Sequence, residues 1–235
     1  MKIVRYILLI GLVGGLNASE FRVVEMTLSA KSPSGMITKM SDKYSYDNMG
    51  RIIRIDTVTK MTTKKEAKTY KRYKEIIGFT KDNRAVKIKY VDLDENSMYY
   101  SNIIYDNHSY IKEKKSDKGI NVKYTNIYDG DKFTKQTDRN SAKTYIYNSK
   151  NQIIKIVSKD TTYYKYNNKN QLVKSYHKDN IKKTLSYSYN SDGALIDVKA
   201  NNIIFHYIYE NKPCTISTIK YNPLSEYINR MICKK

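Results

Sequence analysis

The sequence contains no tryptophan and has only three prolines, nine glycines and two cysteines. So little Pro and Gly excludes collagen-like and linker-like chains. Acidic residues are also scarce, with 23 Asp and Glu against 43 Lys and Arg, so the net charge is +20 at pH 7. A mean hydropathy of −0.68 excludes a polytopic helical membrane protein. The 40% hydrophobic content of the 235 residues still suffices for a packed core.

Residues 1–19 have the pattern of a secretory signal peptide. Lys2 and Arg5 supply the positive charge, residues 6–16 form an uncharged apolar run, and small residues stand at 18–19. This pattern predicts cleavage near residues 18–19 and export to the periplasm or to the outside of the cell. At 1.5 Å per residue the apolar run spans about 16 Å, too little for a hydrocarbon core of about 30 Å. We therefore expect no integral membrane span in the mature chain.

Both cysteines lie near the C-terminus, at Cys214 and Cys233. An oxidising compartment favours their pairing, and the closed loop would stabilise the fold by about 3 kcal/mol. The alternative is two unpaired small side chains held apart by the intervening structure. We predict the disulfide.

A short motif recurs between residues 44 and 220, within one expected domain at 20–235. It has Tyr-x-Tyr, then Asp or Asn, a few polar residues, Gly or Asn, and an alternating aliphatic run. Tyr-x-Tyr places both rings on one face of a strand, and Gly or Asn tolerates the positive φ of a tight turn. Each copy therefore predicts a β-hairpin with one apolar face. The second aromatic residue of the motif is Tyr46, Phe79, Tyr105, Tyr128, Tyr147, Tyr166, Tyr189 and Tyr209.

The alternation after each turn predicts which side chains are buried. In this interpretation two aliphatic residues spaced by two share the core face, and the first residue of the run lies on the opposite face. The tyrosines are expected in the core with their hydroxyls reaching water. The expected core pairs are Ile53/Ile55, Ile154/Ile156 and Ile196/Val198, and the residues expected opposite are Ile52, Ile153, Leu172 and Leu195.

The first copy, YSYDNMGRII at residues 44–53, resembles the YD repeat of the Rhs family and of teneurins. That resemblance implies hairpins that spiral into a hollow β-shell, which in Rhs proteins encloses a C-terminal toxin. This array is short, and neither a toxin-sized domain nor the aspartyl self-cleavage motif follows it. We therefore do not expect this chain to enclose a toxin. The expected fold is all-β, an antiparallel meander of roughly 14 to 17 short strands. We expect a curved sheet, shell or barrel-like form.

A short C-terminal helix is predicted at residues 222–233. Asn222 is a suitable N-cap and Pro223 fits the first helical position. The apolar residues recur at helical spacing and form one stripe, which we expect to pack on the sheet. The stripe comprises Leu224, Tyr227, Ile228, Met231 and Ile232.

Residues 56–76 predict a long projecting hairpin with its tip near residues 64–66. Seven cations crowd residues 60–74, with Tyr70 and Tyr73 interleaved and Glu66 as the one acid in that stretch. This pattern favours contact with a polyanion, such as an anionic glycan, lipid or protein in the envelope or outside the cell. Export makes nucleic acid the less expected anion. The candidate site comprises Lys60, Lys64, Lys65, Lys68, Lys71, Arg72 and Lys74.

A compositional explanation of the charge stays open. Lys outnumbers Arg 35 to 8, and Lys, Asn, Ile and Tyr all have AT-rich codons. An AT-rich genome would thus produce a basic, Tyr-rich chain without any selection for a ligand, and the seven cations would then be ordinary solvated surface.

Catalytic motifs are lacking, so we expect no enzyme, no catalytic residue, no metal and no cofactor. The three histidines, His108, His177 and His206, share no motif. The leading function is a non-enzymatic exported protein that presents a basic, Tyr-rich surface for binding. The alternative is a structural or shielding shell, in the manner of Rhs proteins, that covers a partner polypeptide. Basic and aromatic residues exposed on one face favour the first, and a concave sheet with an unfilled hollow favours the second.

Overall fold

The computed structural model describes residues 15–178 and 180–216, and all the regular structure in these residues is antiparallel β-sheet. The expected all-β meander is therefore confirmed. The strands are β1 (Gly15–Lys31), β2 (Ile37–Tyr46), β3 (Ile52–Thr62), β4 (Ala67–Phe79), β5 (Ala85–Asp92), β6 (Ser97–Tyr105), β7 (Ile111–Ser116), β8 (Asn121–Lys123), β9 (Thr125–Asp129), β10 (Lys132–Thr137), β11 (Ala142–Tyr147), β12 (Ile153–Val157), β13 (Thr162–Tyr166), β14 (Leu172–His177), β15 (Asn180–Tyr189), β16 (Leu195–Ala200) and β17 (Ile203–Ile216).

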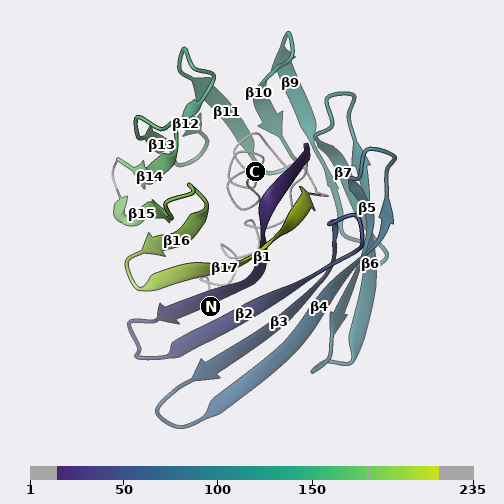
Figure 1. Cartoon of the computed structure of the whole chain (residues 1–235), viewed down its shortest axis with the longest axis vertical. Helices are drawn as coiled ribbons and strands as arrows, with labels where there is room; N and C mark the ends of the chain where they lie inside the picture. Colours follow the sequence, from purple (N-terminus) through teal and green to yellow (C-terminus); the bar gives the residue numbers. More distant parts are fainter. Residues whose placement is uncertain (1–14, 179, 217–235) are drawn as a thin grey trace.

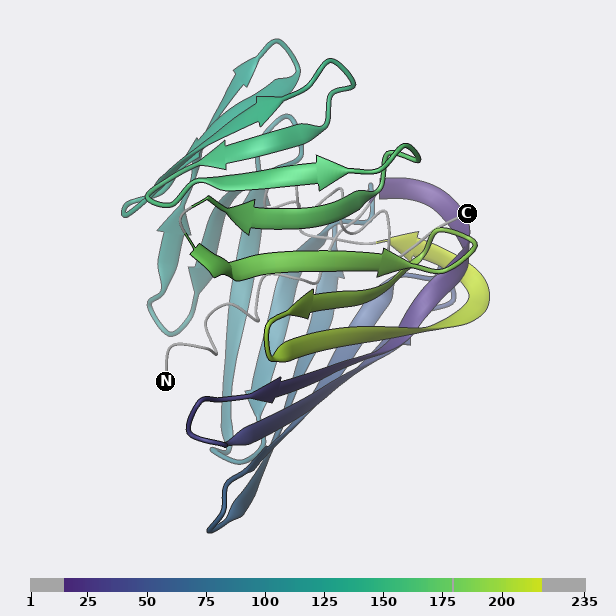
Figure 2. The same ribbon diagram turned by 90° about the vertical axis from the view of Figure 1, so that its left-hand side faces the viewer.

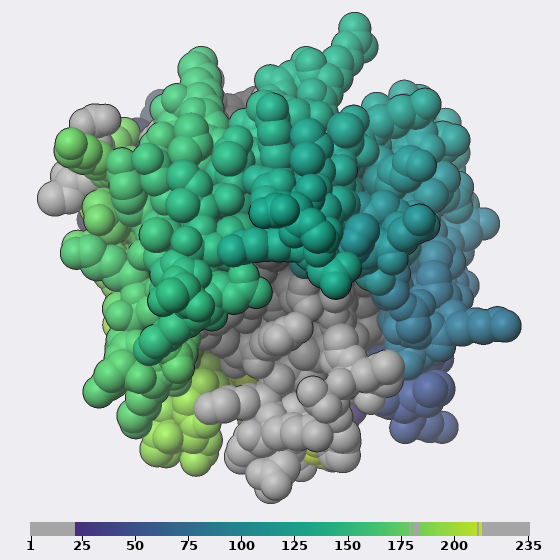
Figure 3. Space-filling view, turned by 90° about the horizontal axis from the view of Figure 1, so that it is seen from above, coloured from purple at the N-terminus to yellow at the C-terminus, as the bar shows by residue number. Residues whose placement is uncertain are grey.

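The sheet returns on itself to form a nearly closed, barrel-like shell (Figure 1). β1 pairs with β2 on one side and with β17 on the other, so the first and last strands are neighbours. Around Tyr124 the ladder changes partners, because β8 pairs with β7 whereas β9 pairs with β10. Seen from above, the strands form a wall that runs from blue through teal to green (Figure 3).

Strand lengths differ between the two halves of the shell. The expectation of short strands is wrong for the first half, where β3 has 11 residues and β4 has 13. Alternation continues in β3 well past the repeat motif, through Thr57, Thr59 and Met61, and β-branched residues favour extended chain. The β3–β4 hairpin therefore extends beyond its neighbours at the lower edge in Figures 1 and 2, as the sequence predicts.

The hairpin turns use the residues that the motif places there. In the first copy, Asp47 Oδ1 accepts hydrogen bonds from the backbone N–H groups of Met49 and Arg51, both at 2.9 Å. Asn148 Oδ1 does the same for Lys150 and Gln152. The predicted turn positions adopt positive φ, namely Gly50 (72°), Asn151 (59°), Asn170 (59°) and Gly193 (79°).

The second tyrosine ties six of the eight motif copies to an earlier strand, and for these copies the expectation that its hydroxyl reaches water is wrong. Tyr166 Oη donates to the carbonyl oxygen of Ile153 at 2.8 Å, and Tyr189 Oη donates to that of Leu172 at 2.6 Å. The polar end of the ring thus satisfies a carbonyl at the start of the preceding hairpin's second strand. The same bond links Tyr46 to Val23, Tyr105 to Ala85, Tyr147 to Phe133 and Tyr209 to Leu195.

The predicted core pairs are wrong in one member each. Ile153 is 4% exposed and shares the inner face with Ile156, three residues on, whereas Ile154 is only partly buried. A register shift opposite Tyr147 causes this, because the bulged residue reverses the alternation. The residues expected opposite the core are in fact buried: Ile52, Ile153, Leu172 and Leu195.

The buried side chains on the inner face of the shell form two clusters. One extends over β1 and β10–β17 and includes Tyr145, Tyr164, Tyr187 and Tyr207, so the expectation of core tyrosines is confirmed. The other lies on β3–β7 around Ile88 and comprises mainly aliphatic residues. The predicted helix at 222–233 lies outside the described residues.

Candidate functional site

The β3–β4 hairpin distributes its seven cations over both faces of the sheet. Lys71 lies opposite Val58 on the outer face, which Lys60 shares. Lys74 lies opposite the buried Ile55, so it shares the inner face with Lys68 and Arg72, which alternate with it along β4. Lys64 and Lys65 are at the exposed tip. The sequence prediction therefore groups residues that do not share one surface.

Acidic neighbours accompany the inner-face cations. Arg72 Nε lies 2.6 Å from Asp92 Oδ2, and Lys68 Nζ lies 3.3 Å from Glu66 Oε1. Lys74 faces the charge of Asp42, which favours the protonated amine. These three cations are therefore less available than the outer ones to a ligand that approaches the hairpin from outside.

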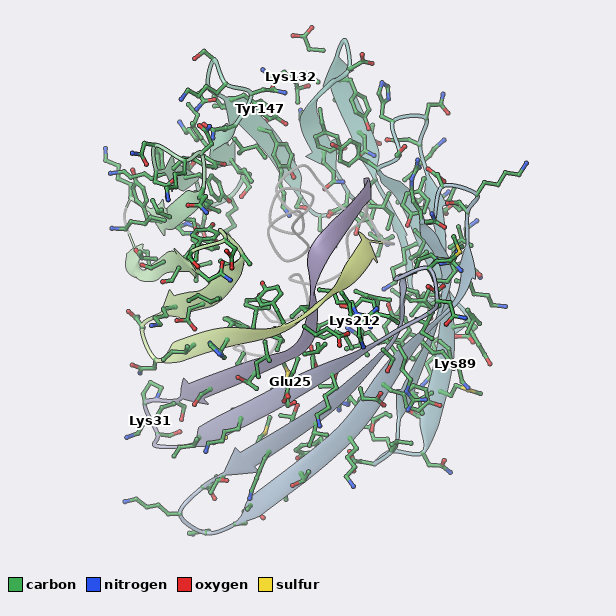
Figure 4. The ribbon with its side chains drawn as sticks, in the orientation of Figure 1. Glu25, Lys31, Lys89, Lys132, Tyr147 and Lys212 are labelled. Carbon is green, nitrogen blue, oxygen red and sulfur yellow. The ribbon has the colours of Figure 1, made fainter. Side chains whose placement is uncertain are left out.

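The outer face carries a basic patch that includes lysines from β1 and β2. Lys39 on β2 lies directly opposite Lys60 on β3, and Lys31 stands at the turn between β1 and β2, where Figure 4 labels it. All members are exposed, and none is within ion-pairing distance of an acid in the described part of the chain. We call Lys31, Lys39, Lys60, Lys64, Lys65 and Lys71 the basic patch.

Like charges placed directly opposite one another repel, which destabilises that strand pair. Lys39 and Lys60 are such a pair. Two acids lie close to the patch: Asp94, whose Oδ2 accepts the backbone N–H of Lys71 at 2.5 Å, and Glu66, which pairs with Lys68. An anion bound across the patch would relieve the repulsion between the lysines.

Sequence reasoning missed Lys31 and Lys39, which lie outside the hairpin segment. Their place beside Lys60 depends on the registers of β1, β2 and β3. The alternation of exposed residues along residues 37–46 was the available signal, but it did not indicate which strand would be adjacent.

A cavity of about 550 Å³ opens on the inner face of β1–β6. Apolar residues line one part of it, among them Met26, Leu28 and Met40. Polar and aromatic residues line another, among them Asp42, Lys74 and Tyr90. A cavity of this size with a few polar groups in an apolar lining has the character of a small-molecule site.

Two lysines on the inner face are partly desolvated. Burial lowers the pKa of Lys74, and the charge of Asp42 opposes that shift. Burial also lowers the pKa of Lys114, and repulsion from Lys74 lowers it further. For Asp42, burial raises the pKa, although its hydrogen bond from Thr57 at 2.6 Å favours the carboxylate. Burial therefore disfavours the charged form of each of these three groups.

The remaining candidates stay apart. His206 Nδ1 lies 2.8 Å from Asp197, His177 Nε2 contacts the hydroxyl of Thr162, and the His108 ring stacks on Tyr128. Among the described residues there is no group of three or more His, Cys, Asp or Glu placed to hold a metal ion. Cys233 lies outside the described residues, so the disulfide with Cys214 stays a prediction.

In residues 15–178 and 180–216 no helix is long and apolar enough to cross a membrane.

Comparison with known proteins reveals no matching family model and no similar curated protein. Two solved structures show a limited likeness. A porin-like protein from Bacteroides uniformis ATCC 8492 is 12% identical, and the match covers 83% of this chain and 98% of that one with a TM-score of 0.44. TcdB2-TccC3 is 10% identical, and the match covers 71% of this chain and 12% of that one with a TM-score of 0.29.

Proposed function

We propose that this chain is an exported, non-enzymatic β-repeat protein that binds polyanions through the basic patch. The observation that carries the proposal is the gathering of six exposed lysines around the directly opposed Lys39–Lys60 pair, with no acid among the described residues in ion-pairing distance of them. The ligand class is an anionic glycan, lipid or protein of the envelope or the exterior. The projecting β3–β4 hairpin, which carries four of the six patch lysines, would reach such a surface before the rest of the wall (Figure 2).

The hairpins are proposed to be YD-type repeats. In the first copy, the Asp, Gly and Arg of the motif each have a structural role in the turn, which supports this assignment. Asp47 Oδ2 lies 2.6 Å from Arg51 Nε while its other oxygen holds the turn, and Gly50 supplies the positive φ. In later copies Asn148 and Asn167 take the place of the aspartate and keep the bond to the backbone. Export and the Cys214–Cys233 disulfide belong to the same proposal.

The alternative role, a shell that covers a partner polypeptide, would need an interior that admits a chain. The closure of the sheet through β1 and β17 favours that alternative. However, the cavity on the inner face has a volume of about 550 Å³, which is the size of a small-molecule site. We therefore favour binding at the outer patch over enclosure of a polypeptide.

The test compares a patch variant with a matched control in binding to heparin resin and to vesicles rich in phosphatidylglycerol. The patch variant replaces Lys39, Lys60, Lys64 and Lys71 with Gln. Each lysine near an anionic surface contributes about 1 kcal/mol, so we expect vesicle affinity to fall by more than about a hundredfold. Binding of the unaltered protein should weaken with added salt, because salt screens exposed charges.

The control replaces Lys165, Lys169, Lys174 and Lys178 with Gln, which removes the same charge elsewhere. All four are exposed, and Lys165 lies directly opposite Lys174 across β13 and β14. We expect the control to keep most of its binding. An equal loss in both variants would contradict the proposal and support the compositional explanation. The preference between resin and vesicle distinguishes a glycan from a lipid ligand.

A further inference from the structure

The cavity on the inner face is separate from the basic patch and is built by the first six strands. On β1, β2 and β3, which carry Lys31, Lys39 and Lys60 of the patch, the lining residues alternate with those of the outer face, so a ligand bound to these lysines from outside does not reach the cavity through the wall. A volume of about 550 Å³ falls within the range of small-ligand sites, which is roughly 300–1,000 Å³.

One part of the cavity suits a flexible apolar chain. Three methionines, Met26, Met40 and Met61, line it together with Leu28 and Ile55. Thioether side chains are unbranched and flexible, so they adapt to ligands of different shape. The neighbouring strands use their backbone groups in the ladder, so the interior is faced by side chains, which include Thr38, Thr57 and Thr59 as well as these apolar residues.

The other part holds Lys74, whose amine faces the charge of Asp42 but forms no hydrogen bond with the described residues. Arg72 is bound to Asp92 at 2.6 Å, and Asp42 accepts the hydroxyl of Thr57 at 2.6 Å. No described residue forms a hydrogen bond or a close ion pair with the Lys74 amine, although Lys74 lines the cavity.

A second amine adds to the positive charge at this point. Lys114 Nζ donates to Tyr90 Oη at 3.2 Å, and Tyr90 lines the cavity beside Lys74 in the facing register. The charge of Lys74 disfavours that of Lys114, so the two are close enough to repel. An anionic group beside Lys74 would satisfy its donors and relieve this repulsion.

We propose that this cavity binds a small amphiphile with one anionic head group, which pairs with Lys74, and an unbranched apolar chain, which packs on the methionines. A carboxylate and a sulfate share this chemistry. The head group contacts Lys74 from the cavity, and Tyr90 and Tyr44 border it.

The test uses the full chain and calorimetric titration with decanoate, decyl sulfate, 1-decanol and decyltrimethylammonium below their aggregation limits. We expect decanoate or decyl sulfate to bind saturably, the alcohol at least tenfold more weakly, and the cation weakest. The preference between the two anions identifies the head group. Because burial of a methylene is worth about 0.8 kcal/mol, affinity should rise about fourfold per added methylene until the cavity is full.

Lys74→Met should lower the affinity for the preferred anion about tenfold, to the level of the alcohol, and leave the affinity for the alcohol unchanged. The matched control is Lys43→Met, an exposed lysine on the outer face of β2 and outside the basic patch, which should bind like the unaltered protein. Equal affinity for anion and alcohol, or no saturable binding of any probe, would overturn the proposal. The comparison of ligands needs no variant, so it decides the question even where Lys74→Met fails to fold. Heparin should not compete, which separates this site from the basic patch.

Discussion

At the scale of the residue, the two tyrosines of a Tyr-x-Tyr copy have different tasks although they share a face. The first fills the interior with its ring, and the second also satisfies a backbone carbonyl of an earlier strand. Tyr147 Oη donates to Phe133 O at 2.5 Å, whereas the hydroxyls of Tyr145 and Tyr207 are buried with no hydrogen-bond partner among the described residues. Abundant tyrosine is therefore a structural requirement of the repeat and not in itself a ligand platform.

Removing one hydroxyl at a time tests this division of tasks. Tyr147→Phe should lower the free energy of unfolding by about 1 kcal/mol, because it leaves a carbonyl without its donor. Tyr145→Phe should be neutral or stabilising, because it removes a buried polar group that lacks a partner. Urea denaturation of both variants is the measurement. Equal destabilisation by the two changes would show that the hydroxyls are not distinguished in this way.

The pair formed by Asp42 and Lys74 is the second residue-scale test. Asp42→Asn removes the carboxylate whose charge favours the Lys74 ammonium, and should destabilise the fold by about 2 kcal/mol or more. Lys74→Met should cost less, and in its presence Asp42→Asn should cost little. A double-mutant cycle by chemical denaturation measures this coupling. Additive effects of the two substitutions would show that the charges do not interact.

At the scale of the element, the hairpin turns are set by local chemistry. An Asp or Asn side chain holds the backbone N–H groups of the turn, and a Gly or Asn adopts the left-handed conformation. The strands that leave each turn then carry a bulge, which decides the face of every later residue in the run. A turn motif thus controls the burial pattern several residues away.

Asn151, with φ of 59°, offers a direct test of the turn. Asn151→Val should lower the free energy of unfolding by about 1–2 kcal/mol, because a β-branched residue is strained at positive φ. Asn151→Gly should be close to neutral, since glycine adopts this conformation without strain. Thermal unfolding of both variants is the measurement. A neutral valine substitution would mean that the turn relaxes to another type.

At the scale of the whole molecule, closure of the sheet joins the two ends of the described chain. Val23 on β1 lies opposite Tyr209 on β17, and the Arg22–Glu210 ion pair at 2.5 Å crosses the same junction. The interior then collects tyrosines from many repeats into one cluster. Closure therefore makes each hairpin depend on the others, and unfolding should be cooperative.

The buried tyrosines predict a sharp alkaline limit. Burial raises the pKa of Tyr44, Tyr145, Tyr164 and Tyr207 above the ordinary value of 10.0. Above pH 10 the unfolded chain loses these protons while the folded chain keeps them, so stability present below pH 10 is lost as the pH rises. The loss is about 1.4 kcal/mol per pH unit for each such tyrosine.

The measurement is circular dichroism against pH together with the tyrosinate absorbance at 295 nm. We expect both signals to change together in a steep transition above pH 10. Gradual ionisation of all tyrosines with the β-sheet signal intact would contradict the prediction, since it would mean that the interior admits water.

The sequence by itself determined the hairpins, the turn positions and the all-β class. These features depend on residues close together in the chain, such as Asn148 and Gln152, so a local sequence pattern is enough to predict them.

The sequence did not determine which faces meet or which strands close the shell. The bulge that buries Ile153 and the register that places Lys39 opposite Lys60 arise from pairing between strands. The cavity of Lys74 needs six strands at once, so only the tertiary structure decided it. Pairing over long sequence separations depends on the fit of whole faces, and no short motif encodes that fit.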